Sequence, residues 1–352
     1  MKVLHFIFPI TGPNNGVKVI SNHIRNSIFN DLTLKINVIN TAQAEEFSNF
    51  GKFRFKKVFH FFKLFKKLLS IHSGDMVYVN VTPRGFAFYR DFLILYCCSL
   101  RTSNITAHLH ANGLEKKING YNKFLFRKLK IIVINKDQKK KLDKLAFNTF
   151  LVPNSLPDYF EAGPPIYPLD EEMKLIFLSN ISKEKGIDRL ERIAEIVSAN
   201  NLKCRMNVFG GALTITDKDK IDELNSNYGF LNYHGPISLE SIKYSALSNN
   251  DVLLFLSDEN YEVYPLVYIE ALMAGVPILT TKQIISEDFI GLGVIDELNG
   301  NMNNFESIIL NYFKDSKEFL ERKKKAREVY GDKYSYRDFI KKIEKIILSE
   351  NK

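Results

Sequence analysis

The feature that most constrains the fold of this chain is a regular alternation of short apolar runs and helical patterns. In the first half, runs rich in β-branched and aromatic residues are separated by stretches with apolar residues at helical spacing. These runs predict strands at Val3–Phe8, Leu34–Ile39, Met76–Val81, Ile105–Leu109 and Ile131–Ile134. Helices are expected between them, for example over Val17–Ile28 and Phe55–Leu69. Strands that alternate with helices form βαβ units, so an α/β fold with a parallel sheet is expected.

The alternation is interrupted once and then begins again. The segments 152–157 and 163–165 are rich in proline and glycine, which is typical of a linker. Beyond it, strands are predicted at Leu175–Leu178, Met206–Phe209, Val252–Leu256 and Pro277–Leu279, and helices at Ile187–Val197, Leu239–Leu247 and Leu266–Ala274. A length of 352 residues suits about two domains. We therefore expect two Rossmann-like, doubly wound domains, 1–155 and 156–335, with a ligand in the cleft between the carboxyl ends of their strands.

Composition and cysteine spacing exclude several classes of protein. Hydrophobic residues make up 45% and charged residues 25% of the chain, as in folded globular proteins. The longest apolar run, near Phe92–Leu100, has about half of the ~20 residues that a membrane span needs. The start of the chain is expected to be a buried strand rather than a signal peptide. Cys97, Cys98 and Cys204 have neither disulfide nor zinc spacing, so a reducing cytoplasm is the expected location.

Charge is divided unevenly along the chain. Residues 1–155 hold 25 Lys and Arg against 8 Asp and Glu, a net charge of +17, whereas residues 156–312 hold 11 against 24, a net charge of −13. Residues 313–352 add 13 against 8, a net charge of +5. The first part therefore favours an anionic partner, either nucleic acid or an anionic membrane. Without a helix-turn-helix, RNA-recognition or zinc pattern, a nucleic-acid partner is not expected.

The segment Lys52–Leu69 interleaves basic residues with phenylalanines. At helical spacing it predicts one apolar face, formed by Val58, Phe61, Phe62, Phe65, Leu68 and Leu69. The basic residues expected to contact anionic lipid are Lys56, Lys63, Lys66 and Lys67. Such a pattern is typical of a helix that lies on an anionic membrane. The alternative is a core-facing helix with a solvated basic face.

A glutamate in an apolar setting is the first sign of a ligand site. Leu266–Ala274 is predicted to be a short helix, with Pro265 suited to its first helical position and Gly275 just past its end. The neighbours of Glu270 at three and four residues are all apolar. A buried carboxylate must be paired or hydrogen-bonded, and two adjacent ribose hydroxyls would fit it. The alternative is an exposed glutamate beside a small hydrophobic patch.

The turn before this helix predicts an anion site. A helix N-terminus, here at Pro265 and Leu266, offers free N–H groups and a partial positive charge, which together bind a diphosphate. Glu262 lies eight residues before Glu270, on the entering loop. It would therefore approach the hydroxyls of a sugar beyond the phosphates.

These residues carry a resemblance to a known family. Glu262-Val-Tyr-Pro-Leu-Val-Tyr-Ile-Glu270, followed by Ala-Leu-Met-Ala-Gly-Val-Pro-Ile-Leu, resembles the E-x7-E signature of glycosyltransferase family 4. The resemblance implies the GT-B fold, a retaining mechanism, and neither a bound metal nor a cofactor. It assigns Glu262 to the donor sugar and Glu270 to the ribose. Val263 departs from the pattern, because the family usually has glycine there.

A second segment extends the resemblance. Leu178-Ser-Asn-Ile-Ser-Lys-Glu-Lys-Gly186 follows a strand, opens a helix and resembles the phosphate-binding segment of the family. The resemblance assigns Lys185 to the leaving diphosphate, which carries the largest charge to develop during glycosyl transfer. Asn180 stands where the family commonly has an arginine. A surface lysine before a helix is the alternative interpretation of Lys185.

Two segments of the first half resemble the family more weakly. Gly12-Pro-Asn-Asn-Gly16 resembles its glycine-rich loop, with Asn15 in place of a usual glycine, and His108-Leu-His110-Ala-Asn-Gly113 resembles its histidine segment. This places His110 beside the reacting sugar, with a structural histidine as the alternative. Asp217-Lys-Asp219 resembles the metal motif of a different glycosyltransferase fold, but it lies in a Lys/Asp-rich helix start, where a solvated face is expected.

Together these resemblances imply a hexosyltransferase-like enzyme that moves a sugar, with retention, from a nucleotide diphosphate to a lipid-linked saccharide acceptor. The catalytic residues would be His110, Lys185 and Glu262, and the donor-binding residues Gly16, Asn180, Lys185, Glu262, Pro265, Leu266 and Glu270. The implied pathway is cell-surface polysaccharide assembly, such as O-antigen or capsule, by a cytoplasmic protein peripheral to the inner face of the membrane. A last helix, 336–352, would pack back on the first domain. The alternatives are a nucleotide-sugar epimerase of the same fold and a catalytically silent nucleotide-sugar-binding subunit of a membrane complex.

Overall fold

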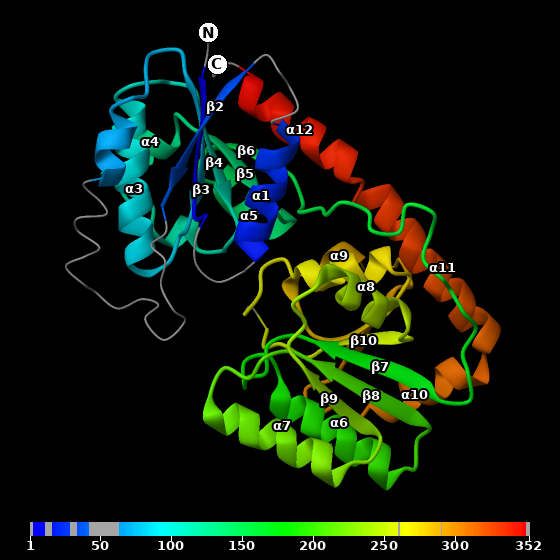
Figure 1. The fold of residues 1–352 in the computed structure, drawn as a ribbon. Helices are drawn as coiled ribbons and strands as arrows, with labels where there is room; N and C mark the ends of the chain where they lie inside the picture. Colours follow the sequence, from blue (N-terminus) through cyan, green and yellow to red (C-terminus); the bar gives the residue numbers. More distant parts are fainter. Residues whose placement is uncertain are drawn as a thin grey trace. The chain divides into compact units, whose positions relative to one another are not determined.

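The computed structural model describes residues 3–10, 16–28, 34–41, 63–259, 261–289 and 291–349. The chain forms two compact units (Figure 1). Unit 1 contains Met1–Leu156 together with Tyr336–Lys352, and unit 2 contains Pro157–Ser335. In the described part of the chain, no helix is long and apolar enough to cross a membrane.

Unit 1 is built on a six-stranded parallel sheet with the order β2-β1-β3-β4-β5-β6. Its strands are β1 (Val3–Phe8), β2 (Lys35–Asn40), β3 (Met76–Val81), β4 (Ile105–Leu109), β5 (Lys130–Val133) and β6 (Asn148–Leu151). Its helices include α1 (Gly16–Ile28), α3 (Gly85–Ser99), α4 (Lys123–Phe126), α5 (Lys136–Asp143) and α12 (Tyr336–Leu348). Every residue of the central strands β3 and β4 is buried, as expected for a parallel sheet covered on both faces.

The last helix, α12, completes unit 1. Its buried residues recur at helical spacing: Phe339, Ile340, Ile343, Ile346 and Ile347. This face packs against α1, β3 and β4. At its first residue, the hydroxyl of Tyr336 lies 2.6 Å from the hydroxyl of Ser27 and donates to the carbonyl of His23, both in α1.

A buried lysine holds the other end of α12. Lys130, in β5, is only 1% exposed. Its ammonium donates to the side-chain oxygen of Asn104 at 2.6 Å and to the backbone carbonyls of Ile347 and Ser349 at 3.1 and 2.6 Å. The ammonium gives partners to carbonyls at the helix C-terminus that the helix itself leaves without any.

Unit 2 repeats the architecture with the strand order β12-β11-β10-β7-β8-β9, again parallel throughout. Its strands are β7 (Met173–Leu178), β8 (Cys204–Phe209), β9 (Leu231–Gly235), β10 (Val252–Phe255), β11 (Ile278–Thr281) and β12 (Ile295–Leu298). Its helices are α6 (Ile187–Ala199), α7 (Ile215–Asn227), α8 (Glu240–Ser248), α9 (Leu266–Met273), α10 (Phe305–Lys314) and α11 (Ser316–Lys333).

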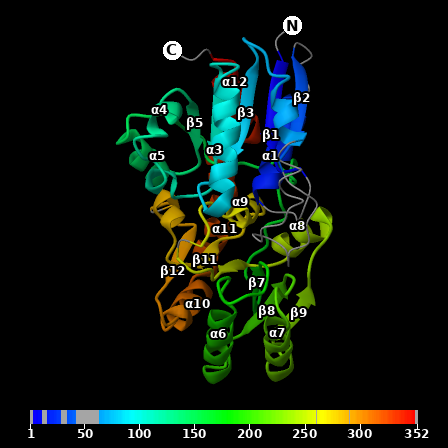
Figure 2. The ribbon, with the colours of Figure 1, turned by 90° about the vertical axis from the view of Figure 1, so that its left-hand side faces the viewer.

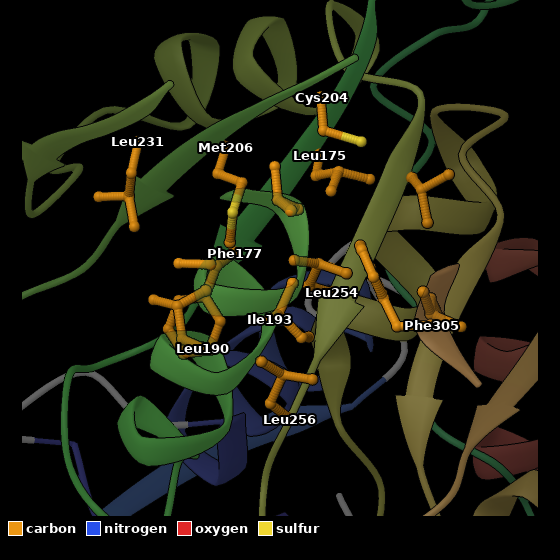
Figure 3. Close-up of a cluster of buried hydrophobic side chains, with 14 of the residues drawn as sticks. Leu175, Phe177, Leu190, Ile193, Cys204, Met206, Leu231, Leu254, Leu256 and Phe305 are labelled. Carbon is orange, nitrogen blue, oxygen red and sulfur yellow. The ribbon is translucent and has the colours of Figure 1, made fainter. Parts of the chain in front are cut away.

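Two helical layers cover the sheet of unit 2. Figures 1 and 2 show α6 and α7 along one face, while α8 and α9 lie on the other face in Figure 1. The core beneath α6 is apolar (Figure 3), where Leu190 and Ile193 of α6 pack with Phe177 of β7 and Leu254 of β10. This core holds β7 and β10 in fixed register, and the candidate site lies at the ends of these two strands.

Candidate active site

The strand order of unit 2 fixes where a ligand can bind. The chain runs from β7 outward through β8 to β9 and then returns to β10 on the other side of β7. The chain therefore leaves β7 and β10 toward opposite faces of the sheet, and such a reversal of strand order is where open α/β sheets commonly bind ligands. The loop after β7 contains Asn180 and Lys185, and the loop after β10 contains Glu262.

A glycine brings these two loops together. Gly186 has a φ of +95°, and a Cβ at this position would lie 2.1 Å from the backbone oxygen of Leu256. Only glycine combines this conformation with so close a backbone approach. The start of α6 therefore sits directly against the residue that follows β10, and it carries Lys185 toward the loop after β10.

Lys185 and Glu262, which the sequence assigns to one site from segments far apart in the chain, contact each other. The ammonium of Lys185 forms a hydrogen-bonded ion pair with Oε1 of Glu262, and it lies 5.2 Å from the centre of the Tyr261 ring. The hydroxyl of Ser257 lies 3.5 Å from the same carboxylate oxygen. Both charged side chains are mostly buried, so their attraction is screened less than that of a surface pair.

Glu270 forms a second pair of the same kind. Its side chain in α9 is buried, and the residue is only 8% exposed, which contradicts the alternative of an exposed glutamate. The ammonium of Lys243, in α8, donates to Oε1 of Glu270 at 2.5 Å and also lies 4.7 Å from the centre of the Tyr244 ring. Sequence reasoning missed Lys243, because nothing in the sequence tells which face of α8 meets α9.

The ends of α9 are close to those predicted. Gly275 follows the helix with a φ of +69°, as expected. Pro265 is the N-cap rather than the first helical residue, because its ψ of 122° is extended, and the helix begins at Leu266. The prediction for Pro265 was therefore wrong by one position. Val263 is buried, so its side chain is part of the packing of this loop.

A hydrogen-bond network supports the loop after β10. The hydroxyl of Thr281 and the amide of Gln283 both donate to the carbonyl of Ser257, at 2.7 and 2.8 Å. On the other side, Arg189 in α6 donates to the carbonyl of Leu256 at 3.0 Å and forms an ion pair with Asp258 at 2.6 Å. The loop is thus fixed from β11 and from α6 before it reaches Glu262.

In unit 1, His110 follows the carboxyl end of β4. Its ring centre lies 4.0 Å from that of His108, whose Nδ1 is 2.5 Å from the hydroxyl of Tyr78. Burial lowers the pKa of His110 to about 3 and holds the pKa of His108 well below its usual range, so both rings are neutral at pH 7. Among the described residues, Nε2 of His110 has no hydrogen-bond partner.

The remaining predicted site residues take no part in the two lysine–glutamate pairs. Gly16 begins α1, and residues 11–15 before it lie outside the described residues. Asn180 is exposed. Asp217 takes part in a capping box with Thr214, the N-cap of α7. Within the described ranges, no group of three or more His, Cys, Asp or Glu side chains could hold a metal ion.

The basic segment Lys52–Leu69 is described only from Lys63. Lys56 lies outside the described residues, whereas Lys63, Lys66 and Lys67 are exposed. Leu68, predicted to lie on the membrane face with Phe65 and Leu69, is buried in the core of unit 1, while those two are exposed. The predicted apolar face is therefore wrong at Leu68, because this turn uses Leu64 and Leu68 to pack on the sheet.

Comparisons with known proteins bear on residues 164–329 and on the fold. The family model described as Glycosyl transferases group 1 matches residues 164–329, which contain both lysine–glutamate pairs. No curated protein sequence matches the chain.

Solved structures share the architecture over nearly the whole chain. HepE of Anabaena, in complex with UDP, is 13% identical, with a TM-score of 0.68 and coverage of 98% of this chain and 99% of that one. A sucrose-phosphate synthase of Thermosynechococcus elongatus is 14% identical, with a TM-score of 0.71 and 98% coverage of each chain. A glycosyltransferase of Rickettsia africae is 14% identical, with a TM-score of 0.72 and 99% coverage of each chain. At this identity the likeness shows the fold, which is GT-B.

Proposed function

We propose that this chain, whose residues 164–329 match the model of group 1 glycosyltransferases and whose fold is GT-B, transfers a sugar with retention from a nucleotide diphosphate to a lipid-linked saccharide acceptor. The observation that carries the proposal is the ion pair between Lys185, at the start of α6, and Glu262, on the loop after β10, together with the pair between Lys243 of α8 and Glu270 of α9. Neither pair is required by a single helix or loop, because each joins two elements. Such pairs suit a ligand that is anionic at one end and rich in hydroxyls elsewhere.

The proposed roles follow from position within unit 2. Glu270, buried in α9, would accept hydrogen bonds from the ribose hydroxyls. The first N–H groups of α9, at Leu266 and after it, together with Lys185, would hold the diphosphate. Glu262, on the loop before the helix, would contact the donor sugar, and Asn180 would line the phosphate side. Unit 2 is thus the proposed nucleotide-sugar domain, and unit 1 the proposed acceptor domain.

In the proposed reaction, Lys185 would stabilise the negative charge that develops on the diphosphate. During transfer the bond between the sugar C1 and the diphosphate oxygen breaks, a bond from the acceptor oxygen to C1 forms on the same face, and the proton of the acceptor hydroxyl passes to the departing diphosphate. The electron pair of the broken bond stays on the diphosphate, so negative charge develops there. A fixed ammonium stabilises that charge without having to be reoriented. The role proposed for His110 is contact with the reacting sugar by a neutral imidazole.

The acceptor and the place of action are proposed from the resemblance. They are a lipid-linked saccharide of a cell-surface polysaccharide such as O-antigen or capsule, at the inner face of the membrane. The net charge of +17 over residues 1–155 supports an anionic membrane beside this unit. HepE binds UDP and, in another structure, UDP-glucose. We therefore expect a uridine diphosphate sugar to be the donor.

A donor panel tests the proposal. The protein is incubated with nucleotide sugars of different bases, UDP-sugars first, and release of the free nucleotide diphosphate is measured. We expect slow hydrolysis of one donor, with the sugar released in the configuration that it had in the donor. Glu262→Gln should abolish the release. Conversion of the nucleotide sugar without release would indicate an epimerase, and binding without either reaction would indicate a silent binding subunit.

A further inference from the structure

The outer face of α3 is apolar, whereas the solvent-facing side of a helix in a globular protein is usually polar. Its exposed large side chains recur at three- and four-residue spacing along the helix and the residue after it: Phe86, Tyr89, Leu93, Tyr96 and Leu100. The opposite face is buried in the core of unit 1 through Phe88, Ile94, Leu95 and Cys98. Figure 1 shows α3 at the edge of unit 1, and Figure 2 shows it in front of the sheet. Phe86 is 80% exposed. A contiguous apolar face of this kind marks an interaction site.

The neighbouring helix α4 extends this surface. α4 packs against α3, with the rings of Phe88 and Phe126 stacked at 6.4 Å. On its outer side, Phe124 is half exposed, and Tyr121, just before the helix, is 90% exposed. We call the exposed apolar residues of both elements the aromatic stripe: Phe86, Tyr89, Leu93, Tyr96, Leu100, Tyr121 and Phe124.

Positive charge accompanies the aromatic stripe. Residues 84–128 contain eight Lys and Arg against two Asp and Glu. One of the two acids, Asp91, is fully buried and paired with Arg90 at 2.8 Å, so this pair adds no net charge to the surface. Lys117 lies over the ring of Tyr89, with its ammonium 6.0 Å from the ring centre. Arg84 and Arg101, at the two ends of α3, are exposed.

We propose that the aromatic stripe is a membrane-docking surface, on which α3 lies flat in the headgroup region of an anionic bilayer. Phenylalanine and leucine would enter the acyl boundary, while tyrosine, lysine and arginine would remain among the headgroups. The stripe spans about 20 Å of helix and suits lying in an interface rather than crossing it. The inference deepens the proposed function, because it rests on that function's lipid-linked acceptor.

The composition of the surface favours lipid over a protein partner. Protein–protein interfaces are depleted in lysine, whereas anionic membranes attract it. Four of the eight basic residues in 84–128 are lysines: Lys116, Lys117, Lys123 and Lys128. In the described part of Lys52–Leu69, which begins at Lys63, Leu64 and Leu68 are buried in the core of unit 1 and are not available for a membrane contact.

Co-sedimentation with vesicles tests the inference. The full chain is mixed with vesicles of phosphatidylcholine alone or of phosphatidylcholine with phosphatidylglycerol. We expect the wild type to bind the anionic vesicles and Phe86→Ser/Leu93→Ser/Leu100→Ser to bind them at least about tenfold less, because three large apolar side chains no longer enter the bilayer. A matched control, Tyr167→Ser/Ile215→Ser/Leu239→Ser, removes three exposed apolar side chains of unit 2 and should bind like the wild type.

Three outcomes would overturn the inference. The first is equal binding of the wild type and the α3 variant to anionic vesicles, with binding lost instead in Lys63→Glu/Lys66→Glu/Lys67→Glu. The second is the absence of wild-type binding to either vesicle. The third is a dimeric wild type that the α3 variant converts to a monomer on gel filtration, which would make a second copy the occupant. Donor hydrolysis measured without vesicles reports on the proposed function separately, and the α3 variant should retain it.

Discussion

At the scale of single residues, each glutamate of the candidate site has a basic partner. Lys185 is paired with Glu262 and Lys243 with Glu270. A diphosphate bound as proposed would share or displace Glu262 at the ammonium of Lys185, and a ribose would share Glu270 with Lys243. Because paired charges in a partly buried site are already stabilised, the affinity for the proposed donor would depend on this exchange as well as on new contacts.

The first prediction concerns Lys185. We expect Lys185→Ala to fold normally and to lower kcat about a hundredfold, because the loss of one group that stabilises developing charge costs on the order of 3 kcal/mol. The measurement is steady-state donor hydrolysis, with circular dichroism as the check on folding. Exposed Lys183→Ala, two residues away, is the control and should keep its activity. Near-normal turnover of Lys185→Ala would remove Lys185 from the proposed mechanism.

The second prediction separates the two glutamates. Glu270→Gln should weaken binding of the free nucleoside diphosphate, because the amide is a poorer acceptor for two ribose hydroxyls. Glu262→Gln should leave that affinity equal to or higher than in the wild type, because it frees the ammonium of Lys185 for phosphate, and yet it should impair sugar transfer. Isothermal titration calorimetry with UDP measures both affinities. An equal loss in the two variants would contradict the separate roles.

A residue of the candidate site could be predicted from the sequence only where the residues that reveal it lie close to it in the chain. Glu270 is recognisable because its apolar neighbours lie within one helical turn, and Glu262 because it lies on the loop that enters that helix. Lys243 is 27 positions from Glu270, and its partner is decided only by the packing of α8 on α9. Gly186 belongs to a recognisable segment, but its closeness to Leu256 depends on two strands being neighbours in the sheet.

At the scale of elements, the central strands were predictable and most edge strands were not. The predicted apolar runs correspond to β1, β2, β3, β4, β5, β7, β8, β10 and β11. The strands that they do not mark are β6, β9 and β12, all at sheet edges. An edge strand is buried less and needs no continuous apolar run, as Ile295-Asp-Glu-Leu298 in β12 shows. α3 is also unmarked, because both its faces are apolar and helical periodicity is lost.

The third prediction concerns the lysine that holds α12. Burial lowers the pKa of Lys130 to about 8, below its value in an unfolded chain. Between about pH 8 and 10.5 the unfolded chain keeps a proton that the folded chain has released, so the free energy of unfolding rises with pH in this window. Relative to Lys130→Met, we expect the wild type to gain on the order of 3 kcal/mol between pH 7 and 10.5.

Urea unfolding at several pH values, followed by circular dichroism, measures this difference. The matched control is Lys128→Met, which changes an exposed lysine two residues away and should follow the wild type at every pH. If Lys130→Met and the wild type show parallel pH profiles, the ammonium of Lys130 is not desolvated in the folded protein.

At the scale of the whole molecule, charge and chemistry are divided between the units. The strongly basic residues 1–155 fall in unit 1, and both lysine–glutamate pairs fall in unit 2. This division suits the proposed function, in which an anionic membrane surface and a nucleotide-sugar donor would be bound by different units.

The fourth prediction follows from this division. Saturating UDP should slow amide hydrogen exchange in unit 2, first in 178–186 and 262–270, because a ligand that binds only the folded state stabilises what it contacts. At a concentration of about 100 times Kd the stabilisation reaches about 2.7 kcal/mol. Protection that appears in unit 1 and is absent from 178–186 would place the nucleotide elsewhere. Glu270→Gln at the same UDP concentration is the control and should show less protection.

The membership of α12 in unit 1 has a consequence for biosynthesis. The chain leaves unit 1 at Leu156 and returns at Tyr336, so the 179 residues of unit 2 are translated between two parts of one folding unit. At usual ribosomal speeds this interval is roughly 10 to 35 s. Throughout it, the nascent first unit has an uncovered apolar strip over α1, β3 and β4, where α12 will pack. The earlier part of unit 1 must wait for α12 before this strip is covered, and we expect a chaperone to bind it during synthesis.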